Sequence, residues 1–192
     1  MYEYKNLYLY YIMKNTKIIK KGSIYIKSVL VRKIYVEFQY VDNYLKDHIL
    51  ARLKEEYEGK CSKEGYVKTN SINIITHSSG VIESNKLSFD VSFECLICHP
   101  VENMKIKCIV KNVTRAGIRA VYYKEEENPI IMFIARENNL KNEEFNKVKE
   151  NDIIITKVIG IRYKLNDEHI SIIGELSSSK KNKRKTTKKN VK

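Results

Sequence analysis

The first half of the chain has the hydrophobic pattern of a small α+β unit. From Ser23 to Phe38 the apolar residues are mostly β-branched, which predicts a strand. Three further strands are expected at Lys60–Thr69, Ile72–Thr76 and Leu87–Ile97, the last of them after the turn-rich segment Thr76–Asn85. With one helix after the first strand, residues 23–98 are predicted to form a β-α-β-β-β unit.

That helix is predicted by apolar residues that recur every fourth position along one face, namely Leu45, Ile49, Leu53 and Tyr57. Asp42 is its expected N-cap, and Gly59 is expected to take the left-handed conformation that ends it.

The second half reads as five strands, at Met104–Thr114, Ile118–Tyr123, Ile130–Ala135, Ile153–Tyr163 and His169–Leu176. This number and spacing predict a small closed barrel of the OB type, a fold that commonly binds nucleic acid or oligosaccharide. In the first of these strands, alternation places Lys105, Lys107 and Lys111 outside the barrel, and Ile106, Cys108 and Val110 inside it.

The predicted class is therefore α+β, with a domain boundary at Pro100, where the first unit ends and the barrel begins. The expected organisation has four parts: an N-terminal extension (1–22), the β-α-β-β-β unit (23–99), the barrel (100–176) and a disordered, low-complexity basic tail (177–192).

Composition narrows the class of protein. The chain has 192 residues and 43% hydrophobic content, enough for an ordinary core. It contains no apolar run long enough to cross a bilayer, and Leu7–Met13 is followed by lysines instead of a cleavage site, so neither a membrane span nor a signal peptide is predicted. Four cysteines without secretory features favour reduced thiols in a cytosol-like compartment.

The net charge of +13 is concentrated at the two ends. Residues 180–192 hold eight Lys and Arg and no acid, and residues 1–33 hold eight and one acid, which leaves residues 34–179 at −2. Salt-sensitive attraction to phosphate is therefore expected mainly at the ends, and RNA contact on the barrel must depend on a few well-placed residues. The abundance of Lys, Ile and Asn indicates an AT-rich genome, such as those of large cytoplasmic DNA viruses and some protists.

Several segments along the chain resemble one family in the same order. They are Glu58–Val67 (EGKCSKEGYV), Ser79–Ile82, the strand Leu87–Cys95, Pro100, the turn Thr114–Gly117, Lys157–Arg162 and Ile172–Glu175. Together they resemble the stalk subunit of multisubunit DNA-directed RNA polymerases, the subunit-7 type of RNA polymerase II and its archaeal and viral relatives. The resemblance covers about residues 24–176 and favours a stalk subunit that is encoded by a large DNA virus.

The resemblance implies a non-enzymatic subunit without a cofactor. Its tip domain, residues 23–99, would dock on the polymerase core, and its barrel would contact nascent RNA. Cellular relatives bind a second stalk subunit, and no membrane is involved. A viral protein would be found in the cytoplasmic viral factory or the virion, and a cellular one in the nucleus. The docking residues carried over are Gly59, Gly65, Tyr66, Ser79, Gly80, Val81 and Ile82, although the glycines are equally explained as sites where the chain turns.

The chain departs from the family pattern in its N-terminal extension, where Met13 is an alternative start, and in its basic tail. The barrel also has Ile118 and Arg119 where nucleic-acid-binding barrels often place an aromatic residue. Cations and tyrosines selected for RNA contact are Lys111, Arg115, Arg119, Tyr122, Lys157, Arg162, Tyr163 and Lys164, because cations hold phosphates and a tyrosine ring can stack on an unpaired base. The alternative is an ordinary solvated surface.

Other functions are less well supported. Cys95-Leu96-Ile97-Cys98-His99 matches a haem-attachment pattern, but covalent haem attachment requires export to an oxidising compartment. Zinc could be bound by Cys61, Cys95, Cys98 and Cys108, but these cysteines lack the second closely spaced pair that is typical of a zinc site. The four histidines are dispersed, and no phosphate-binding glycine loop accompanies them, so no catalytic residues are assigned. A free-standing OB-fold RNA-binding protein of translation or RNA decay remains the alternative.

Overall fold

The computed structural model describes residues 23–124, 128–140 and 142–180. The expectations for the N-terminal extension and for the tail beyond residue 180 lie outside these ranges. The chain divides into two compact units. The first runs to His99 and includes Tyr163–Ile170, and the second comprises Pro100–Arg162 and the chain from Ser171 onward.

The first unit is built on two long antiparallel strands, β1 (Tyr25–Glu37) and β6 (Lys86–Cys98). They pair along their whole length, from Tyr25 opposite Cys98 to Glu37 opposite Lys86. On its other edge β6 pairs with three shorter strands in turn, β3 (Gly65–Val67), β4 (Asn73–His77) and β5 (Val81–Glu83). β2 (Cys61–Ser62) completes this sheet by pairing with β3.

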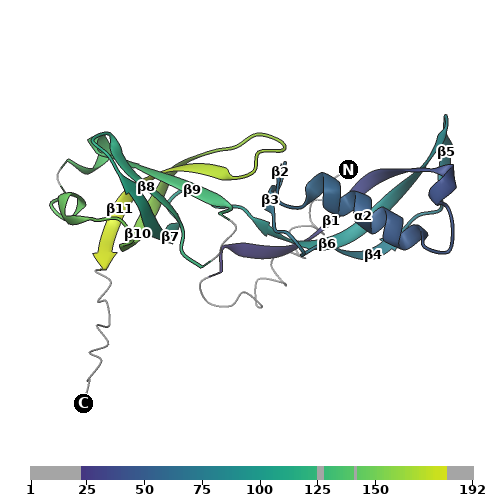
Figure 1. The fold of residues 1–192 in the computed structure, drawn as a ribbon, viewed down its shortest axis with the longest axis horizontal. Helices are drawn as coiled ribbons and strands as arrows, with labels where there is room; N and C mark the ends of the chain where they lie inside the picture. The colour runs from purple at the N-terminus through teal and green to yellow at the C-terminus, as the bar shows by residue number, and fades with distance from the viewer. Residues whose placement is uncertain (1–22, 125–127, 141, 181–192) are drawn as a thin grey trace, which may run out of the picture. The chain divides into compact units, whose positions relative to one another are not determined.

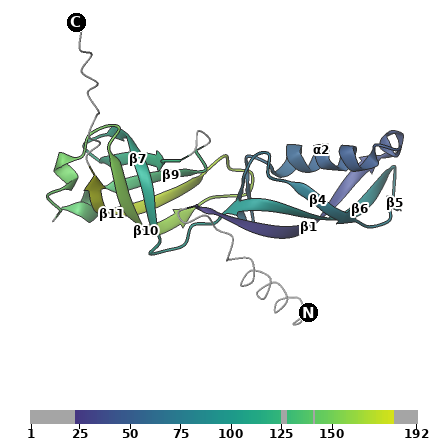
Figure 2. The ribbon, with the colours of Figure 1, turned by 90° about the horizontal axis from the view of Figure 1, so that it is seen from below.

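The helix α2 (Leu45–Tyr57) covers one face of this sheet (Figure 2). As predicted, Ile49 and Leu53 are fully buried, and Leu45 and Tyr57 pack at the margin of the same cluster. The sheet contributes Phe93 and its neighbours on alternate positions of β6. The opposite face of the sheet is not covered by a helix of the described residues, which is common for antiparallel sheets.

The predicted N-cap of the helix is wrong. Asp42 Oδ1 accepts a hydrogen bond of 2.7 Å from Tyr44 N, so its side chain closes the turn that follows the 3-10 helix η2 (Phe38–Tyr40). Tyr44 itself occupies the cap position and makes no side-chain capping bond. At the other end Gly59 has the predicted left-handed conformation, with φ of 72°.

The segment Lys60–Thr69 was expected to be one strand and is instead a tight hairpin of β2 and β3. Gly65 explains the difference, because its φ is 131° and a Cβ there would lie 2.3 Å from Cys98 O. Only glycine fits such a position. A second difference is β5, which lies in the segment expected to be turn-rich and pairs with β6 at Val81–Ser88 and Ile82–Leu87.

The second unit is a closed five-stranded barrel in the order β10-β11-β9-β8-β7 (Figure 1), which confirms the predicted barrel and is compatible with an OB fold. Its strands are β7 (Lys105–Val113), β8 (Gly117–Tyr122), β9 (Ile130–Ala135), β10 (Ile153–Arg162) and β11 (Ile170–Lys180). The predicted alternation in β7 is also confirmed, since Ile106, Cys108 and Val110 are all buried.

The last strand is longer than expected. Ser177–Lys180 was assigned to a disordered tail, but β11 continues to Lys180 because β10 still offers partners, with Ile153 opposite Lys180 and Ile154 opposite Ser179. The link between β9 and β10 carries two 3-10 helices, η3 (Glu137–Asn139) and η4 (Phe145–Lys147). Asn139 is buried there: its Oδ1 accepts from Leu176 N at 3.0 Å, and its Nδ2 donates to Ala135 O at 2.8 Å.

Candidate nucleic-acid interface and docking surface

Three of the predicted RNA-contacting cations gather at one end of β7 and β8. Arg119 faces outward on β8, opposite Asn112 of β7 and opposite Phe133 of β9. Lys111 lies at the bulge between Val110 and Asn112, and Arg115 is in the turn that joins the two strands. These strands are direct neighbours in the barrel, so the cations share one outer surface with Phe133. Lys111, Arg115, Arg119 and Phe133 are called the RNA face below.

The turn that carries Arg115 is held by its own hydrogen bonds. Thr114 Oγ1 donates to Gly117 O at 2.9 Å and accepts from Gly117 N at 3.2 Å. Arg136 fixes the turn from β9's side, because its Nε donates to Arg115 O at 2.9 Å. The backbone of Arg115 is therefore fixed, and its side chain remains exposed.

Phe133 is a candidate that the sequence analysis missed. The residue is 40% exposed, and its Cζ lies 3.0 Å from where a Cβ of Gly117 would be, so the ring rests against the backbone of β8. The signal was present in the sequence: Ile130, Met132 and Ile134 alternate toward the inside, which requires Phe133 to face out. Proteins that bind single-stranded nucleic acid commonly combine an exposed aromatic ring, on which a base stacks, with an arginine that neutralises a phosphate.

Tyr122 does not have the role predicted for it. It is only 3% exposed, because it shares the inward-facing register of Ile118 and Ala120. It presents no open ring face to a base. The neighbouring Tyr123 is half-buried, and Lys107 Nζ lies 4.2 Å from the centroid of its ring.

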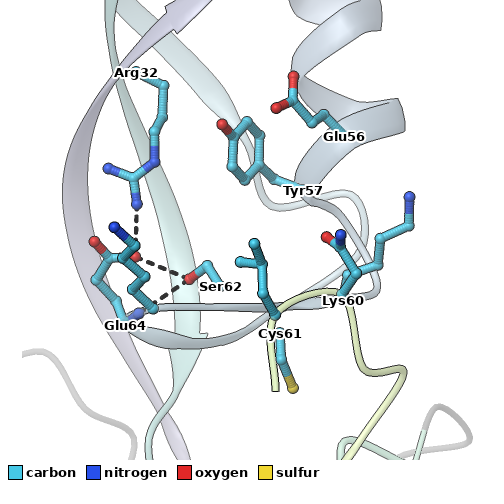
Figure 3. A pocket seen from close by; sticks show the side chains of 10 residues that line it. Arg32, Glu56, Tyr57, Lys60, Cys61, Ser62 and Glu64 are labelled. Atoms are coloured by element: carbon cyan, nitrogen blue, oxygen red, sulfur yellow. Dashed lines mark hydrogen bonds and ion pairs between the residues drawn. The ribbon is translucent and has the colours of Figure 1, made fainter. Parts of the chain in front are cut away.

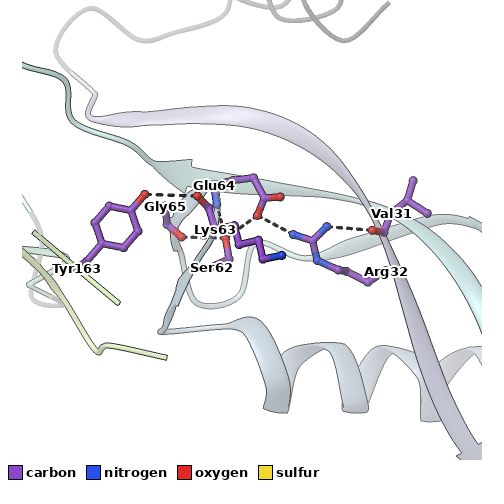
Figure 4. Close-up of polar contacts among 7 residues, drawn as sticks. All are labelled: Val31, Arg32, Ser62, Lys63, Glu64, Gly65 and Tyr163. Atoms are coloured by element: carbon purple, nitrogen blue, oxygen red, sulfur yellow. Dashed lines mark hydrogen bonds and ion pairs between the residues drawn. The ribbon is translucent and has the colours of Figure 1, made fainter. Parts of the chain in front are cut away.

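The remaining predicted RNA contacts lie elsewhere. Lys157 is on β10, and Arg162 is the exposed last residue of that strand. Tyr163 and Lys164 belong to the first unit, where Tyr163 OH donates to Lys63 O at 3.5 Å and Lys164 N donates to Asp167 Oδ2 at 2.6 Å (Figure 4 shows the first bond). The eight predicted residues are therefore divided between the two units.

Pairing of charges differs between the two units. In the first unit three cations of β1 are paired with carboxylates: Lys27 with Glu94 at 2.6 Å, Arg32 with Glu64 at 2.6 Å and Lys33 with Glu83 at 2.9 Å. Within the described residues, the side chains of a second group of cations form no ion pair, namely Lys105, Lys107, Lys111, Arg115, Arg119 and Lys157 of the barrel. A cation of this kind can bind a phosphate without breaking an ion pair.

An apolar surface lies at the end of the first unit where β1 meets η2. Ile82 and Val81 of β5 are 70% and 59% exposed, and Tyr44 before the helix is 66% exposed. Register places these segments at the same end of the sheet, since Val36 of β1 and Ile82 of β5 both pair with Leu87 (Figure 1). The tip surface is defined here by six exposed residues: Phe38, Tyr40, Val41, Tyr44, Val81 and Ile82. Grouped exposed apolar side chains are typical of protein-binding surfaces.

Sequence reasoning named Val81 and Ile82 but missed the segment from Phe38 to Tyr44. The predicted docking residues also divide between the two ends of β6, since Tyr66 pairs with Cys98 and Val81 with Ser88. Tyr66 is buried, and Ser79 is exposed. Gly80 has an internal explanation, because a Cβ there would lie 2.9 Å from the ring of Phe89.

The hairpin end of the first unit contains a polar network beside a hollow of about 510 Å³ (Figure 3). Arg32 donates to Glu64 Oε2 at 2.6 Å and lies 5.7 Å from the ring centroid of Tyr57, and Ser62 Oγ lies 3.0 Å from the same carboxylate oxygen (Figure 4). Burial would raise the pKa of Glu64, but the hydrogen bonds and charge of Arg32, together with Ser62, outweigh burial and hold it below its ordinary value.

None of the four cysteines is in a disulfide, and all four are buried. Burial raises the pKa of Cys95 to about 12 and the pKa values of Cys61 and Cys108 to about 11. Within the described ranges, no three or more His, Cys, Asp or Glu side chains are grouped so that they could hold a metal ion. Nor is any helix in the described part of the chain long and apolar enough to cross a membrane.

No family model matches the chain. An alignment of 173 positions, which covers 80% of this chain and 82% of the relative, is 29% identical to the "Putative DNA-directed RNA polymerase subunit L376" of Acanthamoeba polyphaga mimivirus. This similarity confirms the resemblance to a DNA-directed RNA polymerase subunit of a large DNA virus that the sequence predicted.

Proposed function

We propose that the chain is a stalk subunit of a DNA-directed RNA polymerase and acts in transcription by binding, without catalytic residues of its own. The observation that carries this proposal is the similarity to a viral polymerase subunit over 80% of the chain. An alignment of that extent includes residues of both the sheet unit and the barrel. The similarity is therefore not limited to a barrel of the kind that many unrelated proteins contain.

In this proposal the tip surface docks on the core subunits of the polymerase. Its exposed apolar side chains supply the driving force, because burying an isoleucine or valine contributes about 1.5–3 kcal/mol. Aromatic residues such as Tyr44 and Phe38 are also the types that most often anchor protein interfaces. A second stalk subunit would be a further partner, as in cellular relatives.

The RNA face is the proposed contact for nascent transcript. Its cations have no carboxylate partners in the described residues, and Phe133 adds an aromatic surface. The faces of the second and third strands of OB barrels and the loop between the first and second are common sites for oligonucleotides. β8, β9 and the Arg115 turn occupy those positions here.

The proposed location follows from the polymerase assignment. A viral subunit of this kind would be found in the cytoplasmic viral factory or the virion, whereas a cellular one would be nuclear. The same barrel would also serve a free-standing RNA-binding protein, and the docking experiment separates the two.

The docking experiment compares two exposed isoleucines of the same unit. Ile82 is 70% exposed in the tip surface, and Ile75 is 52% exposed on β4, outside it. Tagged Ile82→Asp and Ile75→Asp proteins are co-purified with the large polymerase subunits. We expect at least a fivefold loss of recovery for Ile82→Asp, equivalent to about 1 kcal/mol of lost burial, and normal recovery for Ile75→Asp.

Normal recovery with both variants would show that the tip surface is not the docking site. Recovery of RNA or ribosomal proteins without polymerase, in the unmodified protein, would reject the stalk function in favour of the free-standing RNA-binding protein. Circular dichroism of each variant confirms that the unit is folded.

A further inference from the structure

We propose that the barrel has a second RNA contact, the β7–β10 lysine cluster of Lys105, Lys107 and Lys157, which binds the phosphodiester backbone of single-stranded RNA. This inference rests on the proposed RNA contact of the barrel and adds a second site to it. It does not depend on docking to a polymerase.

The cluster violates a rule of sheet pairing. Lys157 of β10 lies directly opposite Lys105 of β7, and Lys107 follows two residues later on the same outer face. Like charges directly opposite each other on adjacent strands destabilise a sheet. Such a local conflict is expected where a function maintains it.

No carboxylate of the described residues forms an ion pair with the cluster. None of the three lysines has a carboxylate oxygen within ion-pair distance, although Glu175 of β11 lies opposite Lys157 on the other side. Glu175 offsets part of the charge of Lys157, and a bound phosphate would relieve the repulsion that remains among the three lysines.

An aromatic ring at the edge of the cluster favours nucleic acid over a compact anion. Lys107 Nζ lies 4.2 Å from the ring centroid of Tyr123, and Tyr122 holds that ring in an edge-to-face contact with centroids 5.6 Å apart. Phosphates on the lysines and a base beside Tyr123 would use both features, whereas a phosphate ion alone would use only the first.

The cluster and the RNA face lie toward opposite ends of β7. Lys105 begins the strand, and Asn112, the partner of Arg119, is near its end. Seven residues of strand span about 23 Å. OB barrels bind about 4–16 nucleotides, so a long oligonucleotide can reach both sites and a very short one only one of them.

The test compares two charge-matched variants of the full chain, Lys105→Gln/Lys157→Gln and Lys147→Gln/Lys149→Gln. The second pair lies in and after η4, on the β9–β10 link. Binding of labelled 4-nucleotide and 12-nucleotide oligouridylates is measured by fluorescence anisotropy over a series of salt concentrations, and thermal unfolding is measured for each protein.

Each phosphate contact to single-stranded RNA contributes about 0.7 to the slope of log affinity against log salt. For the cluster variant we expect the 12-nucleotide slope to be shallower by about 1.4 and the affinity about 25-fold weaker near 0.1 M salt. Binding of the 4-nucleotide oligomer should weaken less than that of the 12-nucleotide oligomer, because a short oligomer reaches only one of the two sites at a time. The melting temperature should be unchanged or higher, and the control variant should bind nearly as the unmodified protein does.

An unchanged 12-nucleotide slope in the cluster variant, or an equal loss in the control variant, would overturn the inference. If Phe133→Ala weakens binding and the cluster variant does not, the cluster alone is rejected and the RNA face stands. If the unmodified protein binds neither oligomer, the proposed RNA contact itself fails.

Discussion

Replacing Phe133 with alanine should weaken RNA binding while leaving the barrel folded. Phe133 is 40% exposed, and its ring contacts Gly117 on one side, so part of the ring is accessible to a base. Stacking of a base on an aromatic side chain contributes about 1–3 kcal/mol. Since less than half of the ring is accessible, the lower part of this range applies, about 1–1.5 kcal/mol, or a 5- to 13-fold increase in Kd.

The assay is anisotropy of a labelled 12-nucleotide oligouridylate at constant salt, with Phe133→Tyr and Ile159→Ala as companions. Phe133→Tyr keeps the ring and should bind within about twofold of the unmodified protein. Ile159 is 42% exposed on β10, so Ile159→Ala removes a similarly exposed apolar side chain away from β8 and β9. It should have little effect.

Thermal unfolding of each variant decides whether a change in Kd is a change in binding. If folded Phe133→Ala binds RNA as tightly as the unmodified protein, the role given to the exposed ring is refuted. An equal loss with Ile159→Ala would refute it as well, because the effect would then not be local to the RNA face.

Three further predictions concern stability and reactivity. Gly117→Ala should lower the free energy of unfolding by about 1–3 kcal/mol, because the new Cβ would lie 2.4 Å from Ile134 O. Gly160→Ala is the control: its Cβ would have no neighbouring atom within 4 Å, so chemical denaturation should show almost no change in stability. Because the pKa of Glu64 is lowered in the folded protein, its contact with Arg32 should stabilise at neutral pH and be lost as pH falls below about 4.5. Glu64→Gln should flatten that part of the stability profile, and an identical profile would contradict the pairing. The four thiols should react with a thiol reagent only after unfolding, and rapid labelling of the native protein would contradict their burial.

Periodicity predicted the elements whose two faces differ. The face of α2 that contains Ile49 and Leu53 is buried as expected, and the inward positions of β7 were assigned correctly, because a half-buried element repeats its apolar residues at a fixed spacing. The closed barrel followed from counting such strands.

The missed features depend on contacts between distant residues. The hairpin at Gly65 depends on the close approach of Cys98 O, and the last residues of β11 are in a strand because they pair with the start of β10. A local sequence pattern shows neither contact. For the candidate site, residue type identified Arg119 as an RNA contact. It also selected Tyr163, which belongs to the other unit. Only the pairing of β8 with β9 shows that Phe133 lies beside Arg119.

The most direct test of the central claim is the composition of the complex that the chain forms in its native source. The tagged protein is purified at moderate salt, which weakens contacts made only by its basic ends, and the bound proteins are quantified by mass spectrometry. The account predicts the large subunits of a DNA-directed RNA polymerase in a one-to-one ratio with the chain. Recovery of RNA or ribosomal proteins with no polymerase subunits would contradict it.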